Sequence, residues 1–344
     1  MDKKVVFAVA GSGKTTSIVE RLDLAQRFLI VTFTHANHDN LRAKIIGKFG
    51  WLPDNIVLMT YFSFLYGFCY RPILGMGMAD KGIDYRPPGN EARRFRILDD
   101  GYFMGVGRRL YSNRIARLIE ARGAFADVNR RLEKYYDVLC VDEVQDIAGH
   151  DFNLLLSLCG ATIDIYLVGD FHQHTFDTSR DGAVNTGLHE DYEAYKKRFA
   201  KAGMVVDTRS LATSRRCAPD ICDFITRDLK IAIKSSEEST GKVVEVATQA
   251  EVDELVVRDD VVKLFVQEHY RYGCHSQNWG ASKGEDSHTD VCVVLHDAAG
   301  KARANGGLAG MPAQTVNKLY VACSRARGNL YLAPAKLFKM HKAA

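Results

Sequence analysis

Two short strings carry the residue types that phosphate chemistry requires. The first, AVAGSGKTT, spans residues 8–16 and follows an apolar run. Small residues let backbone N–H groups turn towards a phosphate, and a following helix adds positive potential. Lys14 can reach the β- and γ-phosphates of a nucleotide, and the Thr15 hydroxyl can bind Mg²⁺. A chance glycine turn is the alternative, but the flanking strand and helix patterns favour a phosphate loop.

The second string, DEVQD, covers residues 142–146 and follows the apolar run YYDVLCV. Asp142, at the predicted end of a strand, would hold Mg²⁺ through water. Glu143 would orient and deprotonate an attacking water. The spacing is also typical of a solvated acidic loop. The phosphate loop earlier in the chain favours the catalytic interpretation.

Three other strings place polar side chains beside apolar runs. GDFHQ ends at Gln173, which could sense a γ-phosphate, although an ordinary turn has the same composition. VACSRAR contains Arg325, and SRRCAPDI contains Arg215 and Arg216. Arginines at such positions could stabilise transition-state charge. Surface arginines are common, so each string is a candidate only in combination with the first two.

Composition limits the classes of protein. The chain has 344 residues, is 47% hydrophobic and carries a net charge of +4, which allows two or three domains and a polyanionic partner. Its eight cysteines form no CxxC pair, which argues against structural zinc. No run approaches the roughly 20 apolar residues of a membrane helix, and no secretion signal is evident. We expect a cytoplasmic protein without membrane contact, with a nuclear or viral replication site left open.

The elements that must position these residues follow a regular order. Apolar runs alternate with helical patterns, which predicts an α/β fold with a parallel sheet. A second alternating pattern begins after Val205. The predicted strands cover residues 5–10, 28–34, 55–60, 135–141, 163–168, 243–246, 291–295 and 330–332, and the predicted helices include residues 17–24, 37–49 and 189–202.

The predicted boundaries give a first core at residues 1–60 and 134–205 and a second core at residues 206–344. Residues 61–133 form an Arg-rich, mainly helical insertion. Its Gly- and Pro-rich start would lead into a long helical stretch that ends near Lys134. The insertion would contact a duplex or a nucleic-acid backbone through Arg93, Arg94, Arg108 and Arg109. A solvated helical face is the alternative.

Together the strings resemble the motifs of UvrD/Rep-type superfamily 1 helicases, in the family's order and over nearly the whole chain. AVAGSGKTT, TFTHANHDNLRAKI, TYFSF, DEVQD and VGDFHQHTF correspond to the motifs of the first core. LATSRRCAPDI, GASKGEDSHTDVCVVL and YVACSRAR correspond to those of the second. The chain departs from the family in the short gap between Arg216 and Ser282, which leaves no room for the large second insertion.

The resemblance implies two RecA-like P-loop NTPase domains that hold ATP and Mg²⁺ between them. The implied nucleotide-binding residues are Ala10, Gly11, Ser12, Gly13, Lys14, Thr15, Thr16 and Arg215, whose guanidinium plane could stack on adenine. The implied catalytic residues are Glu143, Gln173, Arg216 and Arg325, and Thr15 and Asp142 are the Mg²⁺ ligands. Phe33, Thr34 and Phe176 would contact a nucleic-acid strand, because aromatic faces stack on bases of any sequence. Core packing is the alternative role for both phenylalanines.

The leading interpretation is an ATP-dependent translocase or helicase on single-stranded nucleic acid. The resemblance implies DNA and 3′→5′ movement, with RNA possible. A second hypothesis is a nucleic-acid-stimulated ATPase subunit or sensor, for which a partner protein supplies the function of the missing insertion. A third is a binding protein without motor activity. The intact set of Lys14, Asp142 and Glu143 argues against the third.

Overall fold

The computed structural model describes residues 1–179, 181–237, 239–285 and 287–342. By packing, the chain divides into two compact units. The first unit comprises Met1–Val6, Thr15–Gly169 and Phe176–Asp207. The second comprises Phe7–Lys14, Asp170–Thr175 and Thr208–Ala344. The phosphate loop and the residues after Gly169 therefore pack with the C-terminal part of the chain, although both follow strands of the first sheet.

The first sheet has six strands in the order β3-β2-β6-β7-β1-β8. The pairs β2–β3, β2–β6, β6–β7 and β1–β8 are parallel. The predicted strands of this core are confirmed to within a few residues. The bounds of these five strands are β1 Lys3–Phe7, β2 Phe28–Thr32, β3 Ile56–Thr60, β6 Val138–Val141 and β7 Asp164–Gly169. The sixth strand, β8 Val205–Asp207, was not predicted.

Two helices of the first unit begin at side-chain caps. Helix α2 (His35–Phe49) starts after Thr34, whose side chain accepts a hydrogen bond from the Asn37 N–H, and ends at Gly50 with φ 85°. Helix α9 (Tyr192–Lys201) is capped by Asp191 in the same way. The other helices of the sheet layer are α1 Lys14–Arg21 and α8 Gly149–Leu158.

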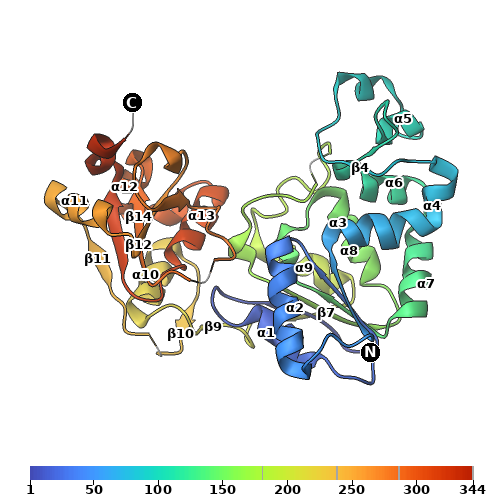
Figure 1. Ribbon diagram of the computed structural model, residues 1–344, viewed down its shortest axis with the longest axis horizontal. Helices are drawn as coiled ribbons and strands as arrows, with labels where there is room; N and C mark the ends of the chain where they lie inside the picture. The colour runs from blue at the N-terminus through green and yellow to red at the C-terminus, as the bar shows by residue number, and fades with distance from the viewer. Residues whose placement is uncertain (180, 238, 286, 343–344) are drawn as a thin grey trace. The chain divides into compact units, whose positions relative to one another are not determined.

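The insertion consists of short segments, so the expectation of one long helical stretch to Lys134 is wrong. Prolines and glycines interrupt residues 71–107, and residues 90–114 hold only elements of two to five residues. Figure 1 shows these segments gathered on one side of the first unit. They are α3 Tyr61–Ser63, a π-helix Phe64–Tyr70, α4 Arg71–Met78, β4 Ile83–Asp84, α5 Asp100–Phe103, β5 Leu110–Tyr111, α6 Ile115–Ala121 and α7 Phe125–Tyr135.

A buried ion cluster fastens the insertion to the rest of the first unit. Arg114 Nε lies 3.1 Å from one Asp181 carboxylate oxygen, and Arg117 Nη1 lies 2.6 Å from the other. The Tyr102 hydroxyl donates to the same carboxylate, and the Arg114 guanidinium lies over the Tyr102 ring. Two of the insertion's arginines therefore stabilise the fold.

The second sheet has five parallel strands in the order β11-β15-β14-β12-β13. Apolar clusters cover both of its faces. The predicted strands at 243–246, 291–295 and 330–332 are confirmed. The bounds are β11 Val243–Glu245, β12 Val261–Phe265, β13 Ser276–Asn278, β14 Asp290–Leu295 and β15 Leu330–Pro334, with α10 Pro219–Leu229, α11 Gln249–Val257, α12 Asp297–Ala304 and α13 Ala313–Cys323.

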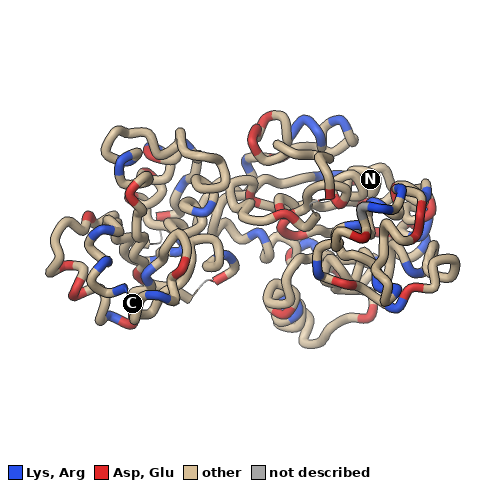
Figure 2. The backbone as a smooth tube through the Cα atoms, turned by 90° about the horizontal axis from the view of Figure 1, so that it is seen from above, with Lys and Arg blue, Asp and Glu red and all other residues tan. Residues whose placement is uncertain are grey.

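The fold is thus α/β with two parallel sheets, as expected for two RecA-like domains. Figure 2 shows acidic and basic residues interspersed along the backbone of each unit. None of the described helices combines the length and hydropathy that crossing a bilayer requires.

The carboxyl group of Asp151 is buried in the core of the first unit. Asp151, in the first turn of α8, is 1% exposed and lies beside a small apolar cavity that Val31, Tyr61 and Phe64 help to line. Neither carboxylate oxygen has a well-formed hydrogen bond, although the hydroxyls of Thr178 and Tyr61 lie nearby. Burial raises the pKa of Asp151 to about 7, and the two hydroxyls offset only part of that effect.

We predict that Asp151→Asn makes the first unit less sensitive to alkaline pH. A raised pKa means that the folded state binds the proton more tightly than the unfolded state, so stability falls as pH rises from about 4 to 7. An amide cannot ionise, so the variant gains up to about 4 kcal/mol over the natural protein above that range. Urea unfolding at pH 5 and pH 8 measures the difference, with the exposed Asp54→Asn as control. An equal effect of Asp151→Asn at both pH values would contradict a neutral buried carboxyl.

Candidate nucleotide and nucleic-acid site

The predicted phosphate loop connects β1 to α1 and is bent by glycines. Gly11 and Gly13 have φ values of 71° and 90°, which glycine adopts at little cost. The Ser12 N–H and hydroxyl both donate to the Val9 carbonyl. A Cβ on Gly11 would lie 2.6 Å from Arg216 Cβ and 2.8 Å from Ser214 Oγ. The loop is therefore shaped by close backbone approach, as a phosphate cradle requires.

The loop packs on the string that contains Arg215 and Arg216. The Arg215 N–H donates to the Gly11 carbonyl at 3.0 Å, and the Val9 N–H donates to the Leu211 carbonyl at 2.9 Å. The structure thus brings the predicted phosphate loop together with the two predicted arginines. The Arg215 side chain is exposed, and that of Arg216 is half-buried.

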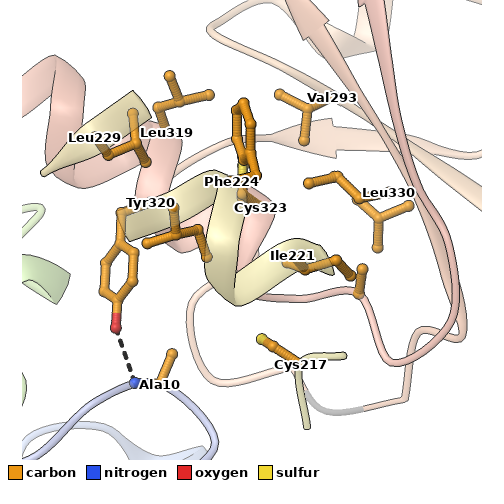
Figure 3. Close-up of a cluster of buried hydrophobic side chains, with 14 of the residues drawn as sticks. Ala10, Cys217, Ile221, Phe224, Leu229, Val293, Leu319, Tyr320, Cys323 and Leu330 are labelled. Carbon is orange, nitrogen blue, oxygen red and sulfur yellow. Dashed lines mark hydrogen bonds between the residues drawn. The ribbon is translucent and has the colours of Figure 1, made fainter. Parts of the chain in front are cut away.

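A tyrosine that the sequence analysis did not single out joins three of the predicted strings. The Tyr320 hydroxyl accepts from the Ala10 N–H at 2.9 Å and donates to the Asp170 carboxylate at 2.9 Å. Figure 3 shows this side chain crossing from α13 to the loop beside the buried cluster of the second unit. Burial raises the pKa of Tyr320 well above its usual value, so the hydroxyl remains a donor at neutral pH. The signal in the sequence was its place directly before VACSRAR.

Further contacts hold the residues after Asp170 against α13. The Asn317 amide donates to the His174 carbonyl at 3.2 Å, and the Gln173 N–H donates to the Asp170 carbonyl. Gln173 itself is buried. Burial lowers the pKa of His172 to about 4, so this ring is neutral at physiological pH. The expected γ-phosphate sensor therefore sits in a tightly packed segment.

The two predicted catalytic arginines both lie close to Ser324, since Arg325 directly follows it in the chain and Arg216 contacts it. Arg216 Nη1 donates to the Ser324 carbonyl at 3.1 Å. Arg325 is 3% exposed, and it donates from Nε to the Val321 carbonyl and from Nη1 to the Glu285 carbonyl. These bonds fix the orientation of both guanidinium groups. A transition-state role for either residue stays a prediction.

The predicted acidic pair follows β6 in the first unit. Asp142 is buried, and its carboxylate accepts from the Glu143 N–H at 2.9 Å. Glu143 has the unusual backbone angles φ 56° and ψ 43°, and its carboxylate accepts from the Gln145 amide at 2.6 Å. A left-handed conformation in a residue other than glycine is costly and is often found at functional sites.

Gly169 makes room for the loop that carries this acidic pair. A Cβ at this position would lie 2.7 Å from Val144 Cγ1, and it would also collide with the Gln145 side chain. Strands β6 and β7 are parallel neighbours, so their carboxyl ends fall at the same sheet edge. The glycine of GDFHQ is therefore needed for packing against DEVQD.

The predicted strand-contacting aromatic residues meet in the first unit. Phe33 follows β2, Phe176 follows the β7 segment, and their ring centroids lie 4.9 Å apart. Both rings are half-buried, and Phe62, of TYFSF, lies 6.0 Å from Phe33. The rings are tilted by 43° and 58°, so they form an open cluster. Thr34, the third predicted contact, caps α2 with its side chain.

The predicted basic contacts are more dispersed. Arg108 donates to the Ala79 and Met78 carbonyls and so caps the end of α4. Arg109 and Arg94 are exposed. The side chain of Arg93 lies outside the part of the chain that the structure describes. Arg108 thus has a role in the fold that the sequence did not reveal.

The residues present fit a nucleoside triphosphate with Mg²⁺. The loop offers backbone N–H groups and Lys14 to phosphate oxygens. The Thr15 hydroxyl and the Asp142 carboxylate are hard oxygen donors of the kind that Mg²⁺ prefers. A glycine-bent loop that opens a helix, with an acidic pair after a strand of the same parallel sheet, defines a P-loop NTPase.

Comparison with known families agrees with this class. A family model described as an AAA domain matches residues 2–177, half of the chain, and the chain therefore belongs to this family. The matched part includes the phosphate loop, DEVQD and GDFHQ. Assignment to the UvrD/Rep-type branch stays a prediction. A search of curated proteins found no match.

Solved structures with a similar fold include viral helicases. The chain aligns with arterivirus nonstructural protein 10 (helicase) in complex with DNA at 16% identity and a TM-score of 0.48, covering 96% of this chain and 60% of that one. The PRRSV helicase aligns at 16% identity and a TM-score of 0.46, covering 97% of this chain and 52% of that one. A crystal structure of arterivirus nonstructural protein 10 (helicase) aligns at 16% identity and a TM-score of 0.47, covering 99% of this chain and 62% of that one. The chain thus spans 52% to 62% of the length of these structures.

We predict that Tyr320→Phe disturbs the phosphate loop more than it disturbs the second sheet. The substitution keeps the ring and removes the donor to the Asp170 carboxylate and the acceptor for the Ala10 N–H, both buried. Loss of such bonds costs about 1–3 kcal/mol of stability. Nucleotide affinity should fall as the loop loses its anchor, as measured by titration with a fluorescent ATP analogue. Tyr270→Phe, at an exposed tyrosine of the same unit, is the control. Unchanged nucleotide affinity would contradict the anchoring role.

Proposed function

We propose that this protein couples ATP hydrolysis to movement along single-stranded nucleic acid. The observation that carries the proposal is the placing of half-buried aromatic rings and an acidic pair at the carboxyl ends of one parallel sheet. Phe33 follows β2, and Asp142 and Glu143 follow its neighbour β6. One sheet edge thus combines groups suited to a nucleobase with groups suited to hydrolysis.

In the proposed reaction, Lys14 and the loop N–H groups bind the phosphates of ATP. Glu143 takes the proton from the attacking water, and Gln173 orients that water or senses the γ-phosphate. Arg216 and Arg325 stabilise the charge that develops on the transferred phosphoryl group. Bound Mg²⁺, held by Thr15 and Asp142, would neutralise phosphate charge. Arg215 would stack on the base.

The proposed binding of single-stranded nucleic acid rests on stacking between aromatic side chains and bases. Phe33 and Phe176 offer aromatic faces to bases without regard to sequence, while exposed arginines such as Arg94 and Arg109 would meet phosphates. The family resemblance favours DNA and 3′→5′ movement, and RNA remains the alternative strand. The same sheet positions the residues for ATP and those for the nucleic acid, so binding of a nucleic-acid strand can influence ATP hydrolysis through the neighbouring β-strands β2 and β6.

A second candidate is a nucleic-acid-stimulated ATPase that does not unwind alone. One observation favours it. Among the described residues between Arg216 and Ser282, the chain forms α10, β10 (Lys234–Ser235), β11, α11, β12 and β13, and these elements belong to the second unit itself. No segment there is available for a separate large domain. A strand-displacement assay on the isolated protein distinguishes the two candidates, and a partner protein that restores unwinding would favour the second.

We predict that single strands stimulate ATP turnover and that Glu143→Gln abolishes it. The amide keeps the size of the side chain but cannot accept the proton of water, so ATP binding should persist. Turnover is measured with and without single-stranded DNA and RNA. Asp54→Asn, an exposed change elsewhere in the first unit, is the control. Normal turnover in Glu143→Gln would show that the base is misassigned, and turnover indifferent to both strands would remove the motor interpretation.

We predict that Phe176→Ala weakens strand binding without changing its dependence on salt. Stacking contributes about 1–3 kcal/mol per base and carries no charge, so the number of released counterions stays the same. Arg94→Ala combined with Arg109→Ala should instead flatten the slope of affinity against salt. Labelled DNA and RNA oligonucleotides are titrated at several salt concentrations. A flattened slope in Phe176→Ala would mean that this residue acts through nearby charges.

A further inference from the structure

The open aromatic cluster continues beyond the sheet onto the insertion. The ring of Tyr85 lies 5.3 Å from that of Phe62, at an interplanar angle of 90°. Phe62 contacts Phe33, and Phe33 contacts Phe176. The four rings form a continuous series, called here the aromatic row: Phe176, Phe33, Phe62 and Tyr85. Phe33 and Phe176 come from the motifs at the sheet edge, whereas Phe62, at the start of the insertion, and Tyr85 both come from the insertion.

Exposure along the aromatic row increases towards the insertion. Phe176, Phe33 and Phe62 are half-buried, whereas Tyr85 is 65% exposed. Tyr61, which stacks near Phe33, is buried and supports the row from below. A ring whose purpose was to join the insertion to the sheet would be covered by it. Tyr85 instead presents most of its surface to solvent, which is where an aromatic ring can receive a planar ligand.

The position of Tyr85 is fixed by its neighbours. Asp80 accepts from the hydroxyls of Tyr66 and Tyr70, at 2.6 and 2.8 Å, and from the Gly82 N–H. Tyr66 and Tyr70 belong to the π-helix, which follows α3, the segment that carries Phe62. The loop that leads to Tyr85 is therefore bonded to the helical segment next to the one that carries Phe62. A fixed ring loses little conformational entropy when a base stacks on it.

The charges on either side of Tyr85 in the chain are paired. Arg86 donates to the Asp84 carboxylate from its backbone N–H, from Nε and from Nη2, at 3.0, 3.0 and 2.8 Å. These bonds lower the pKa of Asp84 to about 2, so the carboxylate stays ionised. The Arg86 guanidinium therefore already has an anionic partner. The exposed Arg109 also lies close to Asp84, with Nη1 3.5 Å from the Ile83 carbonyl oxygen, so a strand phosphate can meet this cation while a base stacks on Tyr85.

We propose that Tyr85 is a stacking site for an unpaired nucleobase and extends the strand-binding surface from the sheet onto the insertion. The inference rests on the proposed binding of single strands at Phe33 and Phe176. It gives the insertion a specific ligand, a single strand, where the arginine content of the sequence had suggested a duplex or backbone contact. It also predicts the order in which a nucleic-acid strand contacts the rings, with Tyr85 at one end of the aromatic row.

The position at the end of the row makes the proposal testable by strand length. A short oligonucleotide fills the sheet part of the row, and only a longer one also reaches Tyr85. We expect Tyr85→Ala to bind the shortest oligonucleotides as the natural protein does. It should bind longer ones about 5- to 150-fold more weakly. A series of labelled single strands of about 4 to 16 nucleotides covers the range of known single-strand sites.

Three variants separate stacking from packing. Tyr85→Phe keeps the ring and should bind normally, whereas Tyr85→Leu keeps apolar bulk without an aromatic face and should behave like Tyr85→Ala. Tyr135→Ala removes an exposed tyrosine that lies near Arg131 and Lys134, outside the row, and should have no effect. Full binding by Tyr85→Leu would overturn the proposal in favour of packing.

The outcomes also separate this proposal from the proposed function. If the natural protein binds no single strand, the proposed function and the role of Tyr85 fail together. If Phe176→Ala weakens binding and Tyr85→Ala matches the natural protein at every length, only the role of Tyr85 fails. Weaker binding of a blunt duplex, with single-strand binding unchanged, would also overturn the proposal.

Discussion

The parallel arrangement of the first sheet is the constraint on which the site depends. In a parallel sheet all carboxyl ends fall at one edge, and side chains that follow different strands are brought together there. Phe33 follows β2, Thr60 ends β3, and Asp142 and Glu143 follow β6. Residues more than a hundred positions apart in the chain therefore share one edge. Hydrogen bonds between the β-strands fix their register and so the positions of the side chains that follow them.

Segments that approach one another closely at this edge require small residues. The packed surroundings also maintain a strained backbone conformation. Gly169 leaves space for Val144 and Gln145, and Gly11 leaves space for the side chains of Arg216 and Ser214. Glu143 adopts a left-handed backbone that only a rigid surrounding can maintain. The phosphate loop is in turn bonded through Ala10 to Tyr320 and so to Asp170. Strain and precise positioning are both maintained by buried hydrogen bonds.

Much of the core could be predicted because apolar runs of five or six residues have few alternatives in an α/β pattern. The strands at 28–32, 138–141 and 290–295 were all found this way. The insertion could not be predicted in the same detail, because Pro and Gly break its periodicity and its segments are held by side-chain bonds. Asp80 joins a loop to a π-helix, and Arg114 joins the insertion to Asp181. Such contacts leave no periodic signal.

The arginines of the insertion show why composition misleads about binding. Arg108 caps α4, Arg114 and Arg117 share Asp181, and Arg122 donates to the Leu98 carbonyl and to Asp100. A guanidinium that is engaged within the fold must give up those bonds before it can meet a phosphate.

Aromatic rings differ from these arginines, because rings that pack by their edges in a tilted cluster leave ring faces open to solvent. The edge of one ring can contact a neighbour while its face remains in solvent, as the perpendicular packing of Phe62 and Tyr85 illustrates. In this protein the residues that make the insertion basic mostly build it. The residue that we propose meets a ligand is Tyr85, the exposed ring of the aromatic row.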